Sequence, residues 1–144
     1  MTDKITNILL VEDDYLDIMN VERELKKIGI IHPIHVARNG REGMKMLRGD
    51  GVPKITPAPK VILLDINMPK MNGIEFLTEL RHEPEFSHIP VFIMTTSNEE
   101  TDRMAAQKLQ VSGYILKPLS FDNFDNNLSS LDSFSLLLDL IKMK

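Results

Sequence analysis

Residues 61–69 read Val-Ile-Leu-Leu-Asp-Ile-Asn-Met-Pro, so an apolar run of four residues ends at Asp65. Three other apolar runs end at polar groups in the same way, at Glu12-Asp13-Asp14, at Thr95 and at Lys117. Short apolar runs bounded by turn residues are typical of buried parallel strands. Parallel strands end at one edge of a sheet, where open α/β sheets bind ligands. We therefore expect these acidic, hydroxyl and ammonium groups to converge at that edge.

Helical patterns alternate with the predicted strands, which is the order of elements in a doubly wound α/β fold. Five strands are expected, at about 7–11, 33–37, 60–64, 90–95 and 113–116. Five helices are expected, the first between Asp14 and Gly29 and the others at about 40–48, 73–82, 98–109 and 120–142. Asp14 is interpreted as an N-cap rather than a metal ligand, with Asp17 in the position of a capping-box acid. Right-handed crossovers then join the strands into one parallel sheet.

The length, charge and composition of the chain exclude several classes of protein. The 144 residues suggest a single domain that spans 1–144. The 21 acidic residues outnumber the 17 basic ones, which disfavours a nucleic-acid-binding surface. The lack of cysteine excludes disulfides and thiolate metal sites. Apolar runs of four or five residues fall far short of the roughly 20 residues that span a bilayer. We therefore expect a soluble, cytoplasmic protein with no nucleic-acid or membrane partner.

The residues at the expected sheet edge favour phosphate chemistry that depends on a metal ion. Glu12, Asp13 and Asp65 would repel one another without a cation, and Mg²⁺ is a hard cation that prefers such oxygen ligands. Lys117 is a point charge suited to phosphate, and Thr95 offers a hydroxyl donor beside it. A carboxylate in contact with Mg²⁺ can act as a nucleophile toward phosphorus and form an aspartyl phosphate. This set of groups is therefore compatible with phosphoryl transfer to a carboxylate.

Four short motifs follow the predicted strands in order. They are Glu12-Asp13, Asp65 with Met68-Pro69 and Gly73, Thr95, and Lys117-Pro118. Together they resemble the receiver domain of a two-component response regulator, over about residues 6–142. The long loop before the third strand, the wording Met-Pro-Lys-Met-Asn-Gly at 68–73 and the Thr-Thr-Ser run at 95–97 are similar to single-domain regulators of the cyanobacterial-phytochrome type. The resemblance implies a flavodoxin-like sheet with strand order 2-1-3-4-5 and a C-terminal helix at about 120–142.

The resemblance also implies which residues bind the metal ion and the phosphoryl group. Asp65 would accept the phosphoryl group from the phosphohistidine of a histidine kinase. Asp13 and Asp65 would bind Mg²⁺ directly, and the backbone carbonyl of Asn67 would complete the protein ligands. Glu12 would act mainly through a metal-bound water.

Further residues carry roles in phosphate binding and switching by the same resemblance. Lys117, Thr95 and the backbone N–H of Thr96 would hold the phosphoryl oxygens. Thr95 and Tyr114 would form the switch, with the aromatic ring turning inward when Thr95 moves toward the phosphate. Lys117-Pro118 corresponds to a cis peptide bond of the family, a geometry accessible mainly to X-Pro bonds.

The expected partner is a sensor histidine kinase, with a phytochrome-like kinase as one candidate. We expect output by protein–protein contact without a DNA-binding output domain, through the face built from the fourth helix, the fifth strand and the fifth helix. A homodimer through this face is one candidate for the apolar tail at 134–141. Packing of that tail on the domain itself is the alternative.

Three other functions compete with a terminal receiver. A phosphatase of the haloacid-dehalogenase type also uses a strand-end aspartate and Mg²⁺, but its general acid would stand where this chain has Asn67. A phosphorelay intermediate that passes the group to a histidine phosphotransferase remains open. A degenerate receiver used as a scaffold is disfavoured because every site residue is present. We therefore expect no enzyme, but a domain that catalyses phosphoryl transfer to, and hydrolysis from, its own aspartate.

Overall fold

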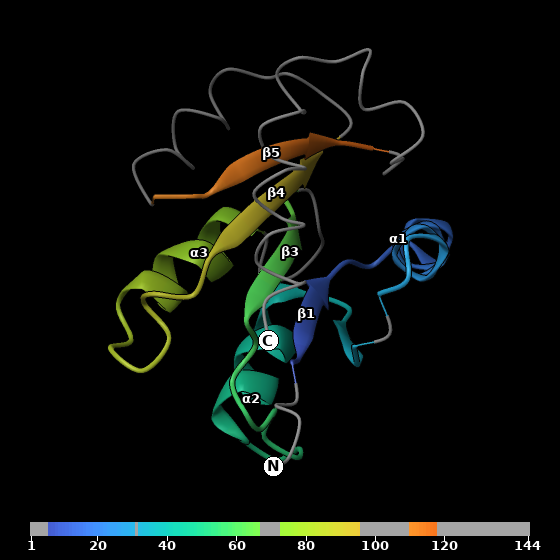
Figure 1. Ribbon diagram of the computed structural model, residues 1–144. Coiled ribbons are helices and arrows are strands. Elements are labelled where there is room, and N and C mark those ends of the chain that lie inside the picture. Colours follow the sequence, from blue (N-terminus) through green and yellow to red (C-terminus); the bar gives the residue numbers. More distant parts are fainter. Residues whose placement is uncertain (1–5, 31, 67–72, 96–109, 118–144) are drawn as a thin grey trace.

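The computed structural model describes residues 6–30, 32–66, 73–95 and 110–117, which form a parallel sheet with helices on both faces (Figure 1). The strands are β1 (Ile8–Val11), β2 (Ile34–Ala37), β3 (Val61–Asp65), β4 (Val91–Thr95) and β5 (Gly113–Leu116). Their order is β2-β1-β3-β4-β5, and every neighbouring pair is parallel. The predicted doubly wound sheet and its strand order are confirmed.

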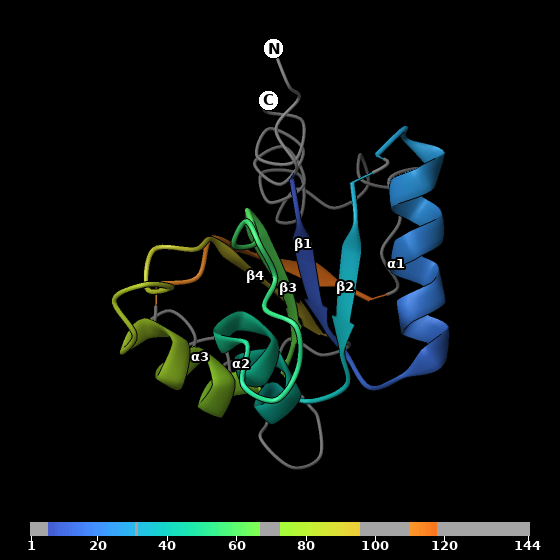
Figure 2. The ribbon, with the colours of Figure 1, turned by 90° about the horizontal axis from the view of Figure 1, so that it is seen from below.

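Three helices lie within the described residues: α1 (Tyr15–Lys27), α2 (Gly40–Arg48) and α3 (Gly73–Arg81). Helix α1 lies on one face of the sheet, and α2 and α3 lie on the other (Figure 2). The predicted helices at about 98–109 and 120–142, with the tail at 134–141, fall outside the described residues. Within the described part of the chain, none of the helices has both the length and the apolar character needed to cross a bilayer.

The start of α1 is held by the side chain of Asp14. Its carboxylate accepts hydrogen bonds from the backbone N–H groups of Leu16 and Asp17, at 2.8 and 3.2 Å. The predicted N-cap is therefore confirmed. The predicted capping box is wrong, because the backbone N–H of Asp14 donates to Glu12 Oε2 at 3.1 Å and not to Asp17. The carboxylate of Asp17 has a different partner, Lys117, which no pattern local to α1 could reveal.

Alternating side chains along each strand build two hydrophobic layers, one on each face of the sheet. In β1, Leu9 and Val11 belong to the layer under α2 and α3, whereas Ile8 and Leu10 belong to the layer under α1. The helices close these layers with buried side chains, which are Met44, Leu47, Phe76, Leu77 and Leu80 on one face and Ile18, Val21 and Leu25 on the other. Because the central strands are buried on both sides, the polar groups of the site gather at the strand ends.

The segment between α2 and β3, the long loop before the third strand, is mostly exposed but is held at two points. Ile55 is buried, and its backbone N–H donates to the carbonyl of Met46 at 3.0 Å. The side chain of Asn7 donates to the carbonyl of Pro57 at 2.8 Å. These contacts fasten the loop near the amino ends of β1 and β3, at the opposite edge of the sheet from Asp65.

Candidate functional site

Four strand ends meet at the carboxyl edge of the sheet. The parallel pairing of β1 with β3 places Glu12, which follows β1, next to Asp65, the last residue of β3. On the other side of β3, Thr95 ends β4, and its carbonyl accepts a hydrogen bond of 2.8 Å from the backbone N–H of Lys117. Residues that are far apart in the sequence thus reach one place, as the strand-end pattern predicts.

Three carboxylates gather at this edge. Glu12, Asp13 and Asp65 each offer an oxygen within 4.8 Å of the other two. Glu12 is fully buried and Asp65 is 5% exposed, while Asp13 is half-buried. The backbone carbonyl of Asp13 is held by the guanidinium of Arg38, which donates to it at 3.2 Å. Since buried like charges repel strongly, this group of acids requires a positive charge nearby.

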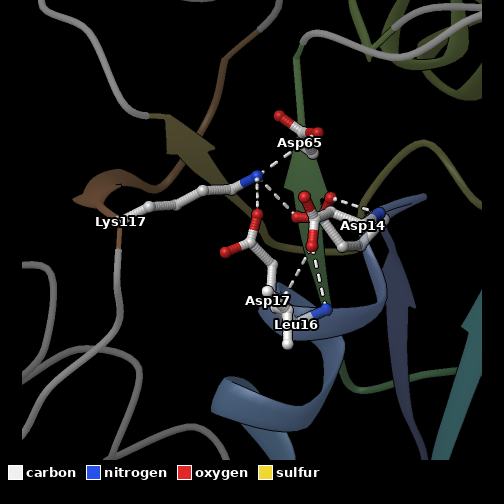
Figure 3. A network of polar contacts seen from close by, with 6 residues as sticks. Asp14, Leu16, Asp17, Asp65 and Lys117 are labelled. Atoms are coloured by element: carbon white, nitrogen blue, oxygen red, sulfur yellow. Dashed lines mark hydrogen bonds and ion pairs between the residues drawn. The ribbon is translucent and has the colours of Figure 1, made fainter.

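Lys117 supplies that charge by reaching from the end of β5 into the acidic group (Figure 3). Its Nζ atom lies 2.7 Å from Glu12 Oε1, 3.0 Å from Asp17 Oδ2 and 3.3 Å from Asp65 Oδ2. The lysine side chain is only 7% exposed, so these ion pairs are poorly screened by solvent. One ammonium thus neutralises part of the charge of several carboxylates, and negative charge remains in excess.

This excess of buried negative charge alters the protonation of both partners. Burial raises the pKa of Glu12 to about 7, and the nearby Asp65 adds to the rise, although Lys117 opposes it. For Lys117, burial acts to lower the pKa, but the close contacts with Glu12 and Asp17 outweigh it and hold the pKa above its ordinary value. Lys117 is fully charged because it contacts three acids. One ammonium cannot neutralise all three carboxylates, so Glu12 is the acid whose pKa rises.

The donor set fits a hard divalent cation. Glu12, Asp13 and Asp65 offer carboxylate oxygens, the ligands preferred by Mg²⁺ and similar ions. Glu12 Oε1 is fully buried, and among the described residues no donor is aligned with it for a hydrogen bond, even though the Lys117 ammonium lies 2.7 Å away. A buried carboxylate oxygen left in this way is costly, and a cation or its bound water would satisfy it.

Gly73 is needed at the start of α3 because the helix approaches the end of β3 closely. A Cβ atom at this position would lie 2.6 Å from the carbonyl oxygen of Asp65 and 2.6 Å from Cα of Ile66. The backbone N–H of Gly73 also donates to the carbonyl of Ile66 at 3.0 Å. The glycine therefore lets α3 press against the backbone that carries Asp65.

Asp17 is the site residue that sequence reasoning missed as a contact of Lys117. The sequence pattern gives it only a place in the capping of α1, yet its carboxylate accepts a hydrogen bond from Lys117 Nζ at 3.0 Å. No pattern local to α1 could have revealed this contact, because its partner follows β5, 100 positions further along the chain.

The structure also locates the two predicted switch residues. Thr95 is buried at the end of β4, and Tyr114 on β5 is half-buried and packs against the core under α2 and α3. The register pairs Ile93 with Tyr114 and Thr95 with Leu116, so Thr95 and Tyr114 lie on the same face of the sheet. Asn67, Thr96 and the Lys117-Pro118 peptide bond fall outside the described residues.

Comparison with known proteins agrees with this geometry. A profile of the response regulator receiver domain matches residues 8–129. Response regulator Rcp1 of Synechocystis sp. is 36% identical over 127 residues, which cover 88% of this chain and 86% of Rcp1. The structure of the phosphorylated cyanobacterial phytochrome response regulator RcpA superposes with a TM-score of 0.78 and 32% identity, over 96% of each chain. The Mn²⁺-bound form of response regulator Rcp1 gives a TM-score of 0.73 and 32% identity, over 96% of this chain and 97% of that one.

These similarities cover the strand ends that build the site as well as the hydrophobic core. They confirm the resemblance to receivers and, more narrowly, to the cyanobacterial-phytochrome type. The chain belongs to the response regulator receiver domain family, whose members act in phosphorelay signal transduction.

Proposed function

We propose that Asp65 accepts a phosphoryl group from the phosphohistidine of a sensor histidine kinase. One observation carries the proposal: a buried carboxylate at a strand end lies 3.3 Å from the Lys117 ammonium and beside two further acids. An Asp65 oxygen would attack phosphorus as the P–N bond breaks. The electron pair of the P–N bond would go to the imidazole nitrogen. Phosphoryl transfer needs positioning and charge neutralisation more than a strong base, and this site offers both.

The metal ion of this proposal is Mg²⁺, held by Asp13 and Asp65, with Glu12 acting through water. When bound, the ion supplies positive charge at the phosphoryl oxygens. The backbone carbonyl of Asn67, outside the described residues, is the proposed third protein ligand. The carboxylate group fits a divalent cation, and the related Rcp1 structure with Mn²⁺ supports the choice of a hard ion.

Lys117 and Thr95 are the proposed holders of the phosphoryl oxygens, together with the backbone N–H of Thr96. Lys117 is charged and close to Asp65, and Thr95 is buried at the neighbouring strand end. The phosphoryl group would draw Thr95 toward it and let the ring of Tyr114 turn inward. Such a change biases two states of the domain and so alters its surface.

The output of this proposal is protein–protein contact. A phytochrome-like kinase as the phosphoryl donor is supported by the similarity to cyanobacterial phytochrome regulators. Homodimerisation through the face built from the predicted fourth helix, β5 and the predicted fifth helix is part of the proposal. Sedimentation velocity at high protein concentration, with and without a phosphoryl mimic, tests the dimer, and a monomer under both conditions contradicts it.

The phosphoryl acceptor is tested by incubation with acetyl phosphate and Mg²⁺, followed by intact mass spectrometry. We expect a gain of one phosphoryl group in the wild type and no gain in Asp65→Asn. Omission of Mg²⁺ should suppress the gain in the wild type. A gain that persists in Asp65→Asn would show that another residue is the acceptor.

A further inference from the structure

Lys117 has one partner that takes no part in the proposed metal site. Glu12 and Asp65 belong to the group of three acids that could hold a cation, whereas Asp17 does not. The hydrogen bond from Lys117 to Asp17 is nonetheless 3.0 Å, shorter than the 3.3 Å approach to Asp65. Asp17 therefore draws the ammonium toward α1, away from the proposed acceptor.

The position of Asp17 is set by the helix on which it lies. Its backbone N–H donates to the N-cap Asp14 at 3.2 Å, which anchors the first turn of α1. Its side chain is 26% exposed, so it lies at the solvent side of the site, whereas Glu12 is fully buried. Figure 3 shows the Lys117 ammonium between Asp17 in the first turn of α1 and Asp65 at the end of β3.

A bound divalent cation would change the balance among these contacts. Positive charge at Glu12, Asp13 and Asp65 repels the ammonium of Lys117 from two of its three carboxylate partners. Asp17 would remain as the partner that the cation does not engage. Lys117 would then have to leave Asp17 before it could contact a phosphoryl oxygen at full strength.

We propose that Asp17 is a positioning residue that competes with the phosphoryl group on Asp65 for the Lys117 ammonium. The inference rests on the proposed function, because it requires phosphate at Asp65. Its consequence is a receiver whose phosphorylated state is weakened by a resting contact of its own lysine. A carboxylate–ammonium hydrogen bond at a poorly exposed site is strong enough to compete with a phosphoryl oxygen.

The test uses the full chain with saturating Mg²⁺ and titrates beryllofluoride, a phosphoryl mimic, by ¹⁵N–¹H NMR. Asp17→Asn removes the negative charge that holds the Lys117 ammonium, and this variant should bind beryllofluoride on the order of fivefold more tightly than the wild type. Asp14→Asn is the matched control, since it loses the same charge in the same turn but does not touch Lys117, and asparagine also caps helices well. It should bind within about twofold of the wild type because its charge is exposed and screened.

A second measurement detects the contact between Lys117 and Asp17 itself. With Mg²⁺ and no beryllofluoride, the Lys117 ammonium cross-peak should be visible in the wild type and in Asp14→Asn. It should be lost to solvent exchange in Asp17→Asn. A peak that is unchanged in Asp17→Asn would overturn the proposal, and so would an affinity equal to that of Asp14→Asn. A wild type that does not bind beryllofluoride would refute the proposed function, and this inference with it.

Discussion

Two clusters of ion pairs in this molecule have similar composition and opposite surroundings. On α2 and α3, Arg48 bonds Glu79 at 2.7 Å and also bonds Glu83, and these side chains are 36%, 36% and 26% exposed. At the sheet edge, the Lys117 ammonium lies 2.7 Å from Glu12 and 3.3 Å from Asp65, and these side chains are 7%, 0% and 6% exposed. Arg48 thus lies between two carboxylates, whereas Lys117 lies among three, the third being the partly exposed Asp17.

The difference in burial separates a structural contact from a chemical site. Water solvates the charges of the exposed cluster, so this cluster links two helices but contributes little to the free energy of unfolding. Water does not reach the charges of the buried cluster in the same way, and burial raises the pKa of Glu12 to about 7. A buried site with a raised pKa responds strongly to a bound cation or anion, because water screens little of the added charge.

The largest expected effect comes from removing the buried cation. Lys117→Met should slow phosphorylation by acetyl phosphate roughly 10²- to 10³-fold, as loss of one preorganised charged donor does at other reaction centres. The rate is measured by intact mass against time at saturating Mg²⁺. A rate within a few-fold of the wild type would show that Lys117 does not contact the transferred group.

The next effect is a pH dependence of stability that originates in Glu12. Its pKa is raised from 4.5 to about 7, so the folded protein binds more protons than the unfolded chain between these values. Stability therefore falls as pH rises from about 4.5 to about 7, and then levels off. Relative to Glu12→Gln, the metal-free wild type should lose about 2–3 kcal/mol across this window.

Urea unfolding at several pH values, with and without Mg²⁺, measures this loss. Saturating Mg²⁺ should remove most of the slope, because the ion stabilises the charged form of the acids. Parallel curves of unfolding free energy against pH for the metal-free wild type and Glu12→Gln would mean that the pKa of Glu12 is not raised in the folded protein.

A smaller effect is expected from the backbone contact beside Asp65. Gly73→Ala places a Cβ atom 2.6 Å from the Asp65 carbonyl oxygen, so β3 or α3 has to move. We expect a loss of about 1–3 kcal/mol in unfolding free energy and slower phosphorylation. Gly43→Ala is the control, because its new Cβ meets the ring of Phe76 at 2.9 Å and not the site. Equal phosphorylation rates in the two variants would disprove the link to Asp65.

The smallest effect should come from the exposed cluster. Arg48→Met should lower the unfolding free energy by about 0.5–1 kcal/mol, and the difference should shrink at high salt. Phosphorylation should be unchanged, since Arg48 lies on α2 and pairs only with α3 and the turn that follows it among the described residues. A loss as large as that of a buried pair would erase the contrast between the two clusters.

Much of the fold followed from local patterns. The five apolar runs identified the strands, and the cap at Asp14 identified the start of α1. The convergence of Glu12, Asp65 and Lys117 followed from the rule that parallel strands end at one edge. The capping box was the local error, because the backbone N–H of Asp14 found a buried carboxylate outside the helix.

The sequence by itself determined which polar groups end the strands, because burial of both sheet faces leaves such groups no other place. It could not determine how Lys117 divides its charge among Glu12, Asp17 and Asp65. That division depends on distances of a few tenths of an ångström and on exclusion of water by segments far apart in the chain. Electrostatic energies in a buried site vary steeply with both, so only the tertiary structure decided them.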